Sequence, residues 1–81
     1  MIATADKIKE IIKEADVLSD DVESLKCDVE LEEQGIDSLD MANIYLLCEE
    51  EFDMKIPDED ISKVKTIDGL VEYINSKISK A

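Results

Sequence analysis

The stretch at residues 35–40, Gly-Ile-Asp-Ser-Leu-Asp, contains the side chain with the clearest potential for chemistry, the hydroxyl of Ser38. This serine could be a catalytic nucleophile, the N-cap of a helix, or a residue that another enzyme modifies. A serine nucleophile needs a base, usually histidine, and an oxyanion hole. The chain has no histidine, no lysine lies near Ser38 in the sequence, and 81 residues leave little room for a substrate pocket. We therefore expect no catalytic activity and no catalytic residue.

A helix N-cap explains a polar side chain at this point, but both Ser38 and Asp37 are candidates for the cap. Serine and aspartate are both favoured N-caps. The capping box that begins at Ser38 is incomplete, because position 41 is methionine instead of an acidic residue. If Asp37 is the cap, Ser38 becomes the first helical residue and its hydroxyl is free. The spacing alone does not decide between the two.

Modification is the third alternative, and the setting of Ser38 suits it. The free backbone N–H groups and the positive end of the dipole favour a phosphate at the start of a helix. Gly35 can supply the turn that presents the serine. An exposed Ser38 at a helix start would be a suitable attachment point for a phosphate-linked group.

Apolar residues at helical spacing predict the elements that must position this serine. The expected helices cover residues 4–15, 38–52 and 57–63, and a last helix extends from its cap to residues 77–79. Thr4 and Thr66 suit the caps of the first and last helices, and Pro57 suits the first position of the short one. The sequence predicts one all-α domain over residues 1–81, a small four-helix bundle with three longer helices and one short helix.

A long first loop separates the first two predicted helices, over residues 16–37. Residues 19–24, Ser-Asp-Asp-Val-Glu-Ser, could form a short helical turn within it, with Ser19 as the cap. The stretch Leu25–Leu31 alternates loosely between apolar and polar residues, as strands do. We interpret it as an ordered loop, because the sequence offers no second strand to pair with it.

The helix predicted over residues 38–52 has more apolar residues than one small domain can bury. One stripe at helical spacing should face the core: Met41, Ile44, Tyr45, Cys48 and Phe52. A second set points away from that stripe: Leu39, Ala42 and Leu46. Acidic and amide side chains border the second set: Asp40, Asn43, Glu50 and Glu51. The surplus predicts an exposed apolar strip with a polar rim.

The charge of the chain is strongly negative and unevenly distributed. The whole sequence carries −13, from 22 acidic residues and nine basic ones. Between Glu14 and Asp60 there are 18 acidic residues and two lysines, a net of −16. This distribution argues against nucleic acid and against insertion at an anionic membrane surface. It favours protein partners with basic patches.

Two cysteines, Cys27 and Cys48, are the only thiols. The N-terminal residues lack the apolar region of a signal peptide, and no stretch approaches the length of a membrane span. We therefore expect a cytoplasmic protein with reduced thiols. Two cysteines without a histidine do not make a structural metal site, and we expect none.

Three segments together resemble the acyl carrier proteins of fatty-acid synthesis. They are Gly35-Ile36-Asp37-Ser38-Leu39-Asp40, Glu49-Glu50-Glu51-Phe52-Asp53 and Ile56-Pro57-Asp58-Glu59. The resemblance implies a carrier without catalytic activity. In that family a transferase that uses Mg²⁺ moves 4′-phosphopantetheine from coenzyme A to the serine, here Ser38 flanked by Asp37 and Leu39. The thiol of the arm then carries acyl groups as thioesters in fatty-acid, related lipid or polyketide biosynthesis.

The resemblance also implies where partners and cargo bind a monomeric carrier. Phosphopantetheinyl transferase and acyl-processing enzymes would dock their basic patches on Asp37, Leu39, Asp40, Ala42, Asn43, Leu46, Leu47, Glu50 and Glu51. Acyl chains would slip between the helices into a cavity lined by Ile44, Tyr45, Cys48, Phe52, Ile61, Leu70, Val71 and Ile74.

Five positions depart from the residues usual in the fatty-acid type: Asn43, Tyr45, Leu46, Leu47 and Cys48. A specialised carrier of another lipid pathway is therefore an alternative, as is a peptidyl or D-alanyl carrier. A further alternative is an acidic interaction module in which Ser38 stays unmodified.

Overall fold

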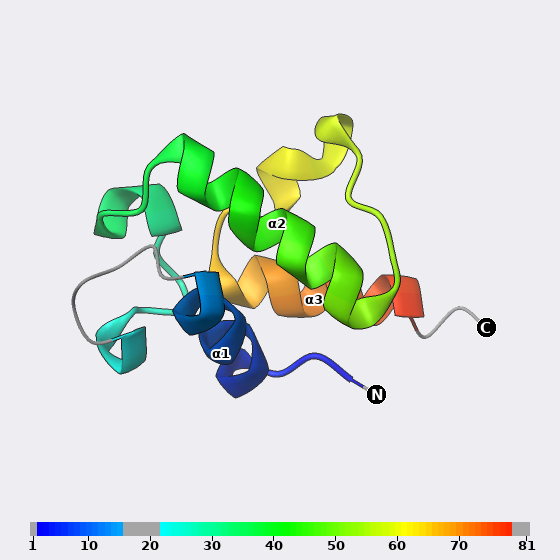
Figure 1. Cartoon of the computed structure of the whole chain (residues 1–81), viewed down its shortest axis with the longest axis horizontal. Helices are drawn as coiled ribbons and strands as arrows, with labels where there is room; N and C mark the ends of the chain where they lie inside the picture. Colours follow the sequence, from blue (N-terminus) through cyan, green and yellow to red (C-terminus); the bar gives the residue numbers. More distant parts are fainter. Residues whose placement is uncertain (1, 16–21, 79–81) are drawn as a thin grey trace.

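The computed structural model describes residues 2–15 and 22–78, and every regular element in them is helical. The three α-helices are α1 (Ala5–Ala15), α2 (Ser38–Phe52) and α3 (Ile67–Ile78). Three 3₁₀ helices lie between them: η1 (Val22–Ser24), η2 (Leu31–Gln34) and η3 (Asp58–Lys63). The green α2 runs diagonally across the centre of Figure 1, and α1 packs against both α2 and α3. The all-α bundle with three long helices and a short one is confirmed. No helix in the described part of the chain could span a membrane.

The predicted caps are confirmed for the first and last helices and need a correction for the short one. Thr4 Oγ1 accepts the N–H of Lys7 at 3.1 Å, and Thr66 Oγ1 accepts the N–H of Gly69 at 2.9 Å. Pro57 is the cap of η3, not its first residue, because its ψ of 153° is extended. Its carbonyl accepts the N–H of Asp60 at 2.9 Å, three residues on, which closes a 3₁₀ turn.

The described part of the first loop is ordered, as expected for Leu25–Leu31, because side-chain and backbone bonds pin it. The Gln34 side chain accepts from the N–H of Lys26 at 2.7 Å and donates to the carbonyls of Lys26 and Val29, each at 2.9 Å. Further along, the Leu31 N–H donates to the carbonyl of Lys65 at 2.9 Å. The loop is thereby fixed to the connection between η3 and α3. Within the short turn expected over residues 19–24, Val22–Ser24 form η1, whereas the expected cap Ser19 lies outside the described residues.

The core is aliphatic and takes residues from each α-helix and from the first loop. Its fully enclosed large side chains are Ile8, Ile11, Ile12, Leu31, Ile36, Ile44, Cys48, Val64, Ile67, Leu70 and Ile74. The stripe predicted on α2 faces this core, although Tyr45 is only half-buried at its edge. The bundle therefore holds α2 by one face and leaves the opposite face to solvent.

Candidate functional site

Ser38 is the first residue of α2, and Asp37 is the N-cap. The Asp37 Oδ1 atom accepts the backbone N–H of Asp40 at 3.0 Å, and the Asp37 carbonyl accepts the N–H of Met41 at 2.9 Å. The sequence left the cap open between two residues, and the geometry decides for Asp37. The helix therefore does not use the hydroxyl of Ser38, and this residue is exposed to solvent.

A left-handed turn and two buried anchors fix the position of Ser38. Gly35 ends η2 with a φ of 102°, a conformation that glycine adopts at little cost. Ile36, before the serine, and Met41, after it, are both buried in the core. Because the chain is held on both sides, Ser38 is presented at a defined point of the surface.

The start of α2 offers the groups that a phosphate ester on Ser38 requires. The first N–H groups of a helix have no partner within it, and the Asp37 side chain occupies only that of Asp40. Within residues 2–15 and 22–78, no protein group accepts from the N–H of Ser38 or Leu39. These N–H groups and the helix dipole favour an anion at this point. The residues present therefore fit the phosphate-linked group that the resemblance implies.

An apolar strip, formed by Leu39, Ala42 and Leu46, leads away from the serine along the solvent face of α2. Leu39 is 78% exposed and Leu46 is 54% exposed, although both are large apolar side chains. Ala42 is exposed between them. Burial of the opposite face of α2 in the core explains why these residues have no partner within the described fold. The predicted strip is present.

The other residues expected to dock partners are not equally available. Asn43 and Glu50 are exposed, and Asp40 is half-buried. Leu47 is half-buried and packs against the core. Glu51 forms an ion pair with Lys7 of α1, with 3.2 Å between Nζ and Oε2. The apolar strip is therefore flanked most openly by Asn43 and Glu50, while Leu47 and Glu51 are engaged within the bundle.

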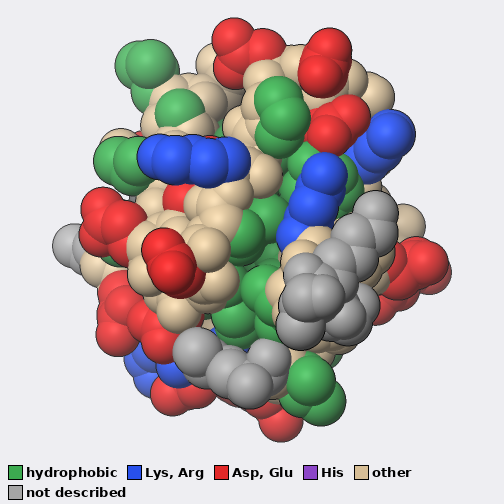
Figure 2. Space-filling view, turned by 90° about the vertical axis from the view of Figure 1, so that its right-hand side faces the viewer, with side chains coloured by type: hydrophobic (Ala, Val, Ile, Leu, Met, Phe, Trp, Pro, Cys, Tyr) green, Lys and Arg blue, Asp and Glu red, His purple; other side chains and the backbone are tan. Residues whose placement is uncertain are grey.

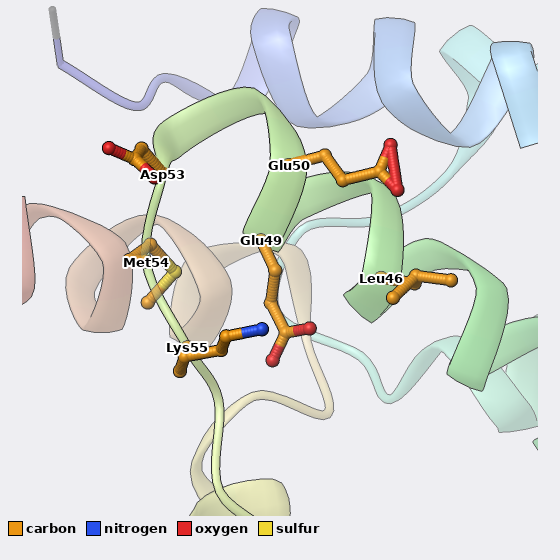
Figure 3. A pocket seen from close by; sticks show the side chains of 6 residues that line it. All are labelled: Leu46, Glu49, Glu50, Asp53, Met54 and Lys55. Carbon is orange, nitrogen blue, oxygen red and sulfur yellow. The ribbon is translucent and has the colours of Figure 1, made fainter.

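A pocket of about 340 Å³ lies where the apolar strip meets the end of α2. Its lining residues, drawn in Figure 3, are Leu46, Glu49, Glu50, Asp53, Met54 and Lys55. Glu49 and Lys55 point toward one another in this view, and Glu49 Oε2 also accepts the N–H of Ile56 at 2.7 Å. Sequence periodicity did not reveal this pocket, because its lining combines residues of α2 with Met54 and Lys55, which follow the left-handed turn at Asp53, with a φ of 50°.

The segment around the site is acidic, and most lysines lie outside it. Residues Glu14 to Asp60 contain 18 acidic residues and two lysines. On the face shown in Figure 2, which lies to the right in Figure 1, lysine and carboxylate side chains surround apolar ones. The segment that contains Ser38 carries a net charge of −16 between Glu14 and Asp60.

The residues predicted to line an acyl cavity lie in or against one hydrophobic cluster beneath α2. The buried members are Ile44, Cys48, Phe52, Leu70 and Ile74. The half-buried members are Tyr45, Ile61 and Val71. Burial, with a smaller effect of Glu49, raises the pKa of the Cys48 thiol to about 12. Cys48 is therefore a protonated core group, whereas Cys27 is a half-exposed free thiol.

Two tyrosine hydroxyls join elements around this cluster. Tyr45 donates to the carbonyl of Val64 at 3.1 Å, and Tyr73 donates to Asp60 Oδ2 at 2.6 Å. The bond from Tyr73, helped by Lys63, lowers the pKa of the Asp60 carboxyl. The sequence indicates that a buried Tyr45 needs a partner but does not identify it. The bond between Tyr73 and Asp60 joins α3 to η3 and was not expected.

Comparison with known proteins agrees with this geometry. Residues 6–74 match the family model described as a phosphopantetheine attachment site. An acyl carrier protein of Bdellovibrio bacteriovorus is 39% identical over 72 residues, which cover 88% of this chain and 90% of that protein. An acyl carrier protein of Clostridium perfringens is 37% identical over 75 residues, which cover 93% of this chain and 97% of that protein.

The helical bundle and the matched attachment site define a phosphopantetheine-bearing carrier domain. With relatives this similar over nearly the whole chain, the protein belongs to the acyl carrier protein family. As a member of that family, it carries acyl intermediates on a 4′-phosphopantetheine cofactor.

Proposed function

We propose that Ser38 is the residue that carries 4′-phosphopantetheine, as a phosphate ester through its hydroxyl oxygen. The observation that carries this proposal is the bond from the Asp40 N–H to Asp37, because it leaves Ser38 exposed with an unused hydroxyl. Asp37 holds the start of α2, and the N–H groups of Ser38 and Leu39 face the ester. The bound group supplies the thiol for thioester formation. The chain itself performs no catalytic step.

We further propose that partner enzymes dock on the apolar strip and its rim. Leu39 and Leu46 supply an apolar centre, and Asp37, Asp40, Asn43 and Glu50 supply a polar rim, the usual arrangement of a protein interface. Complementary charge accelerates encounter and selects partners. A carrier with −16 between Glu14 and Asp60 therefore favours enzymes with lysine and arginine patches, including the transferase that loads Ser38.

The hydrophobic cluster beneath α2 is proposed to shelter the acyl chain. A chain in water gains about 0.8 kcal/mol for each methylene that it buries. Ile44, Leu70 and Ile74 are apolar and fully enclosed, so they offer the environment that an acyl chain seeks. Access requires the helices to part, because protein interiors are close-packed.

We propose that the protein acts in the cytoplasm as a monomer. Cys27 and Cys48 are both free thiols, as is usual in a reducing compartment. Among the described residues only three large apolar side chains are exposed, namely Ile2, Leu39 and Leu46. This is little apolar surface for an obligate dimer. Fatty-acid synthesis and a specialised lipid or polyketide pathway both remain compatible with the site.

Counting thiols tests the carrier function. The chain has two cysteines, so the apo protein contains two thiols and the loaded protein three. We expect incubation with a phosphopantetheinyl transferase, coenzyme A and Mg²⁺ to add one thiol in denatured protein. That thiol should then accept an acyl group that hydroxylamine removes. A thiol count that stays at two, with a transferase that loads another carrier, would support the unmodified interaction module instead.

A further inference from the structure

The hydrogen bond between Tyr45 and Val64 joins α2 to the connection between η3 and α3 at the edge of the core. The Tyr45 hydroxyl on α2 donates to the carbonyl of Val64 at 3.1 Å. Val64 follows η3 directly and is fully buried, whereas Tyr45 is half-buried. This single bond therefore ties α2 to the connection between η3 and α3. We call the contact between α2 and this connection, at Tyr45 and Val64, the α2–Val64 seam.

Tyr45 lies two helical turns from Ser38, on the same side of α2. The two residues are seven positions apart, which is a rotation of about 700° and a rise of about 10 Å along the helix. Two full turns are about 720°, so Tyr45 points in nearly the same direction as Ser38. The buried Ile44 and Cys48 lie to one side of this direction, and the exposed Leu46 lies to the other. Tyr45 thus stands at the boundary between the core and the solvent face.

We propose that Tyr45 is a specificity-determining residue that limits the length of acyl chain sheltered by this carrier. This inference rests on the proposed attachment at Ser38. A chain that crosses the α2–Val64 seam meets the Tyr45 ring before it reaches Ile44 or Leu70. A medium chain is accommodated beside the ring by adjustment of aliphatic side chains. A long chain has to displace the ring and break its bond to Val64.

Displacement of the ring is unfavourable for two physical reasons. The Val64 carbonyl would lose the Tyr45 hydroxyl as its donor, and a buried polar group without a partner is costly. The ring also fills volume at the edge of a close-packed core, so its removal requires repacking. Burial, together with Glu32 and Glu30, raises the pKa of Tyr45 to about 12, so the hydroxyl remains a donor at neutral pH.

The test compares acyl chains of three lengths in two variants of this residue. Wild type, Tyr45→Phe and Tyr45→Val are loaded with butyryl, octanoyl or palmitoyl groups. Tyr45→Phe removes only the hydroxyl, and Tyr45→Val removes the ring as well. Two readouts are the thermal midpoint and the amide chemical shifts of Ile44, Leu70 and Ile74, which are fully buried and so report a chain inside the core.

Tyr73→Phe is the matched control, because it also removes a hydroxyl that bonds another element. Tyr73 donates to Asp60 at 2.6 Å and joins α3 to η3, so its bond does not involve α2. We expect this variant to lose some stability but to keep the chain-length profile of wild type. If it relaxes the limit as Tyr45→Val does, the chain passes between η3 and α3, and the proposal for Tyr45 is overturned.

In wild type we expect octanoyl to raise the thermal midpoint and to shift the core amides, and palmitoyl to add no further gain. In Tyr45→Val, palmitoyl should raise the midpoint several degrees beyond octanoyl, with Tyr45→Phe between the two. If the thermal midpoint depends on chain length in the same way in wild type and Tyr45→Val, the proposal is overturned. If the chemical shifts of the core amides change with none of the acyl chains, the proposal is also overturned, whereas the proposed attachment at Ser38 is not affected. A failure of loading itself refutes the attachment site instead.

Discussion

Replacement of Asp37 by alanine should destabilise the fold through the loss of one capping bond. Asp37 Oδ1 accepts the N–H of Asp40 at 3.0 Å, and the residue is otherwise exposed. Only the cap is lost, so we expect a cost of about 1 kcal/mol in the free energy of unfolding. For a domain of about 60–100 residues, this corresponds to a fall of about 4–8 °C in the thermal midpoint.

The assay is thermal unfolding of the apo proteins, followed by circular dichroism. Asp37→Asn is the matched control, because asparagine keeps the acceptor and removes the charge, and it should unfold close to wild type. Ser38→Ala should change the free energy of unfolding by less than about 0.5 kcal/mol, as is usual at exposed sites. A loss in Ser38→Ala as large as that in Asp37→Ala would refute the reasoning. Serine would then be the cap, and its hydroxyl would not be free.

Three further predictions concern charge, cations and pH. Reversal of charge in Asp40→Lys or Glu50→Lys should slow loading by the transferase several-fold and weaken its salt dependence, whereas Glu72→Lys on α3 should have little effect. Equal loading rates in all three variants would exclude electrostatic docking on α2. Millimolar Mg²⁺ or Ca²⁺ should raise the thermal midpoint more than NaCl of equal ionic strength, because repulsion within a net charge of −16 opposes folding; an unchanged midpoint would contradict this. The pKa of Cys48 is raised from 9.0 to about 12, so the folded state keeps this thiol protonated where the unfolded state would ionise it. The stability that the protonated, buried thiol contributes is therefore complete below pH 9 and is lost as pH rises toward 12. Urea unfolding should show this loss in wild type and less of it in Cys48→Ala, and a thiol reagent should modify Cys27 before Cys48.

Local patterns allowed much of the fold to be predicted from the sequence. The α2 helix begins at Ser38 and ends at Phe52 as expected, because apolar residues at helical spacing mark its length. Thr4 and Thr66 cap their helices as expected, because a cap depends on residues only three positions apart. The exposure of Leu39 also followed from spacing, since only one face of α2 can meet the core.

The remaining contacts join residues that are distant in sequence or depend on exact dihedral angles. The bond from Tyr73 to Asp60 spans 13 residues, and no spacing rule predicts it. Gln34 bonds Lys26 and Val29 only because the loop folds back on η2. Pro57 is a cap because its ψ is extended, which the residue type leaves open. Between Asp37 and Ser38, the choice of cap needed the geometry of the helix start.

Intact mass measures whether Ser38 carries the phosphopantetheine group. Wild type, Ser38→Ala and Ser62→Ala are each incubated with a phosphopantetheinyl transferase, coenzyme A and Mg²⁺. Ser62 is the control, because it is also an exposed serine in a helical segment, η3. We expect wild type and Ser62→Ala to gain the mass of one phosphopantetheine and Ser38→Ala to gain none. The same mass gain in Ser38→Ala would show that another residue carries the group.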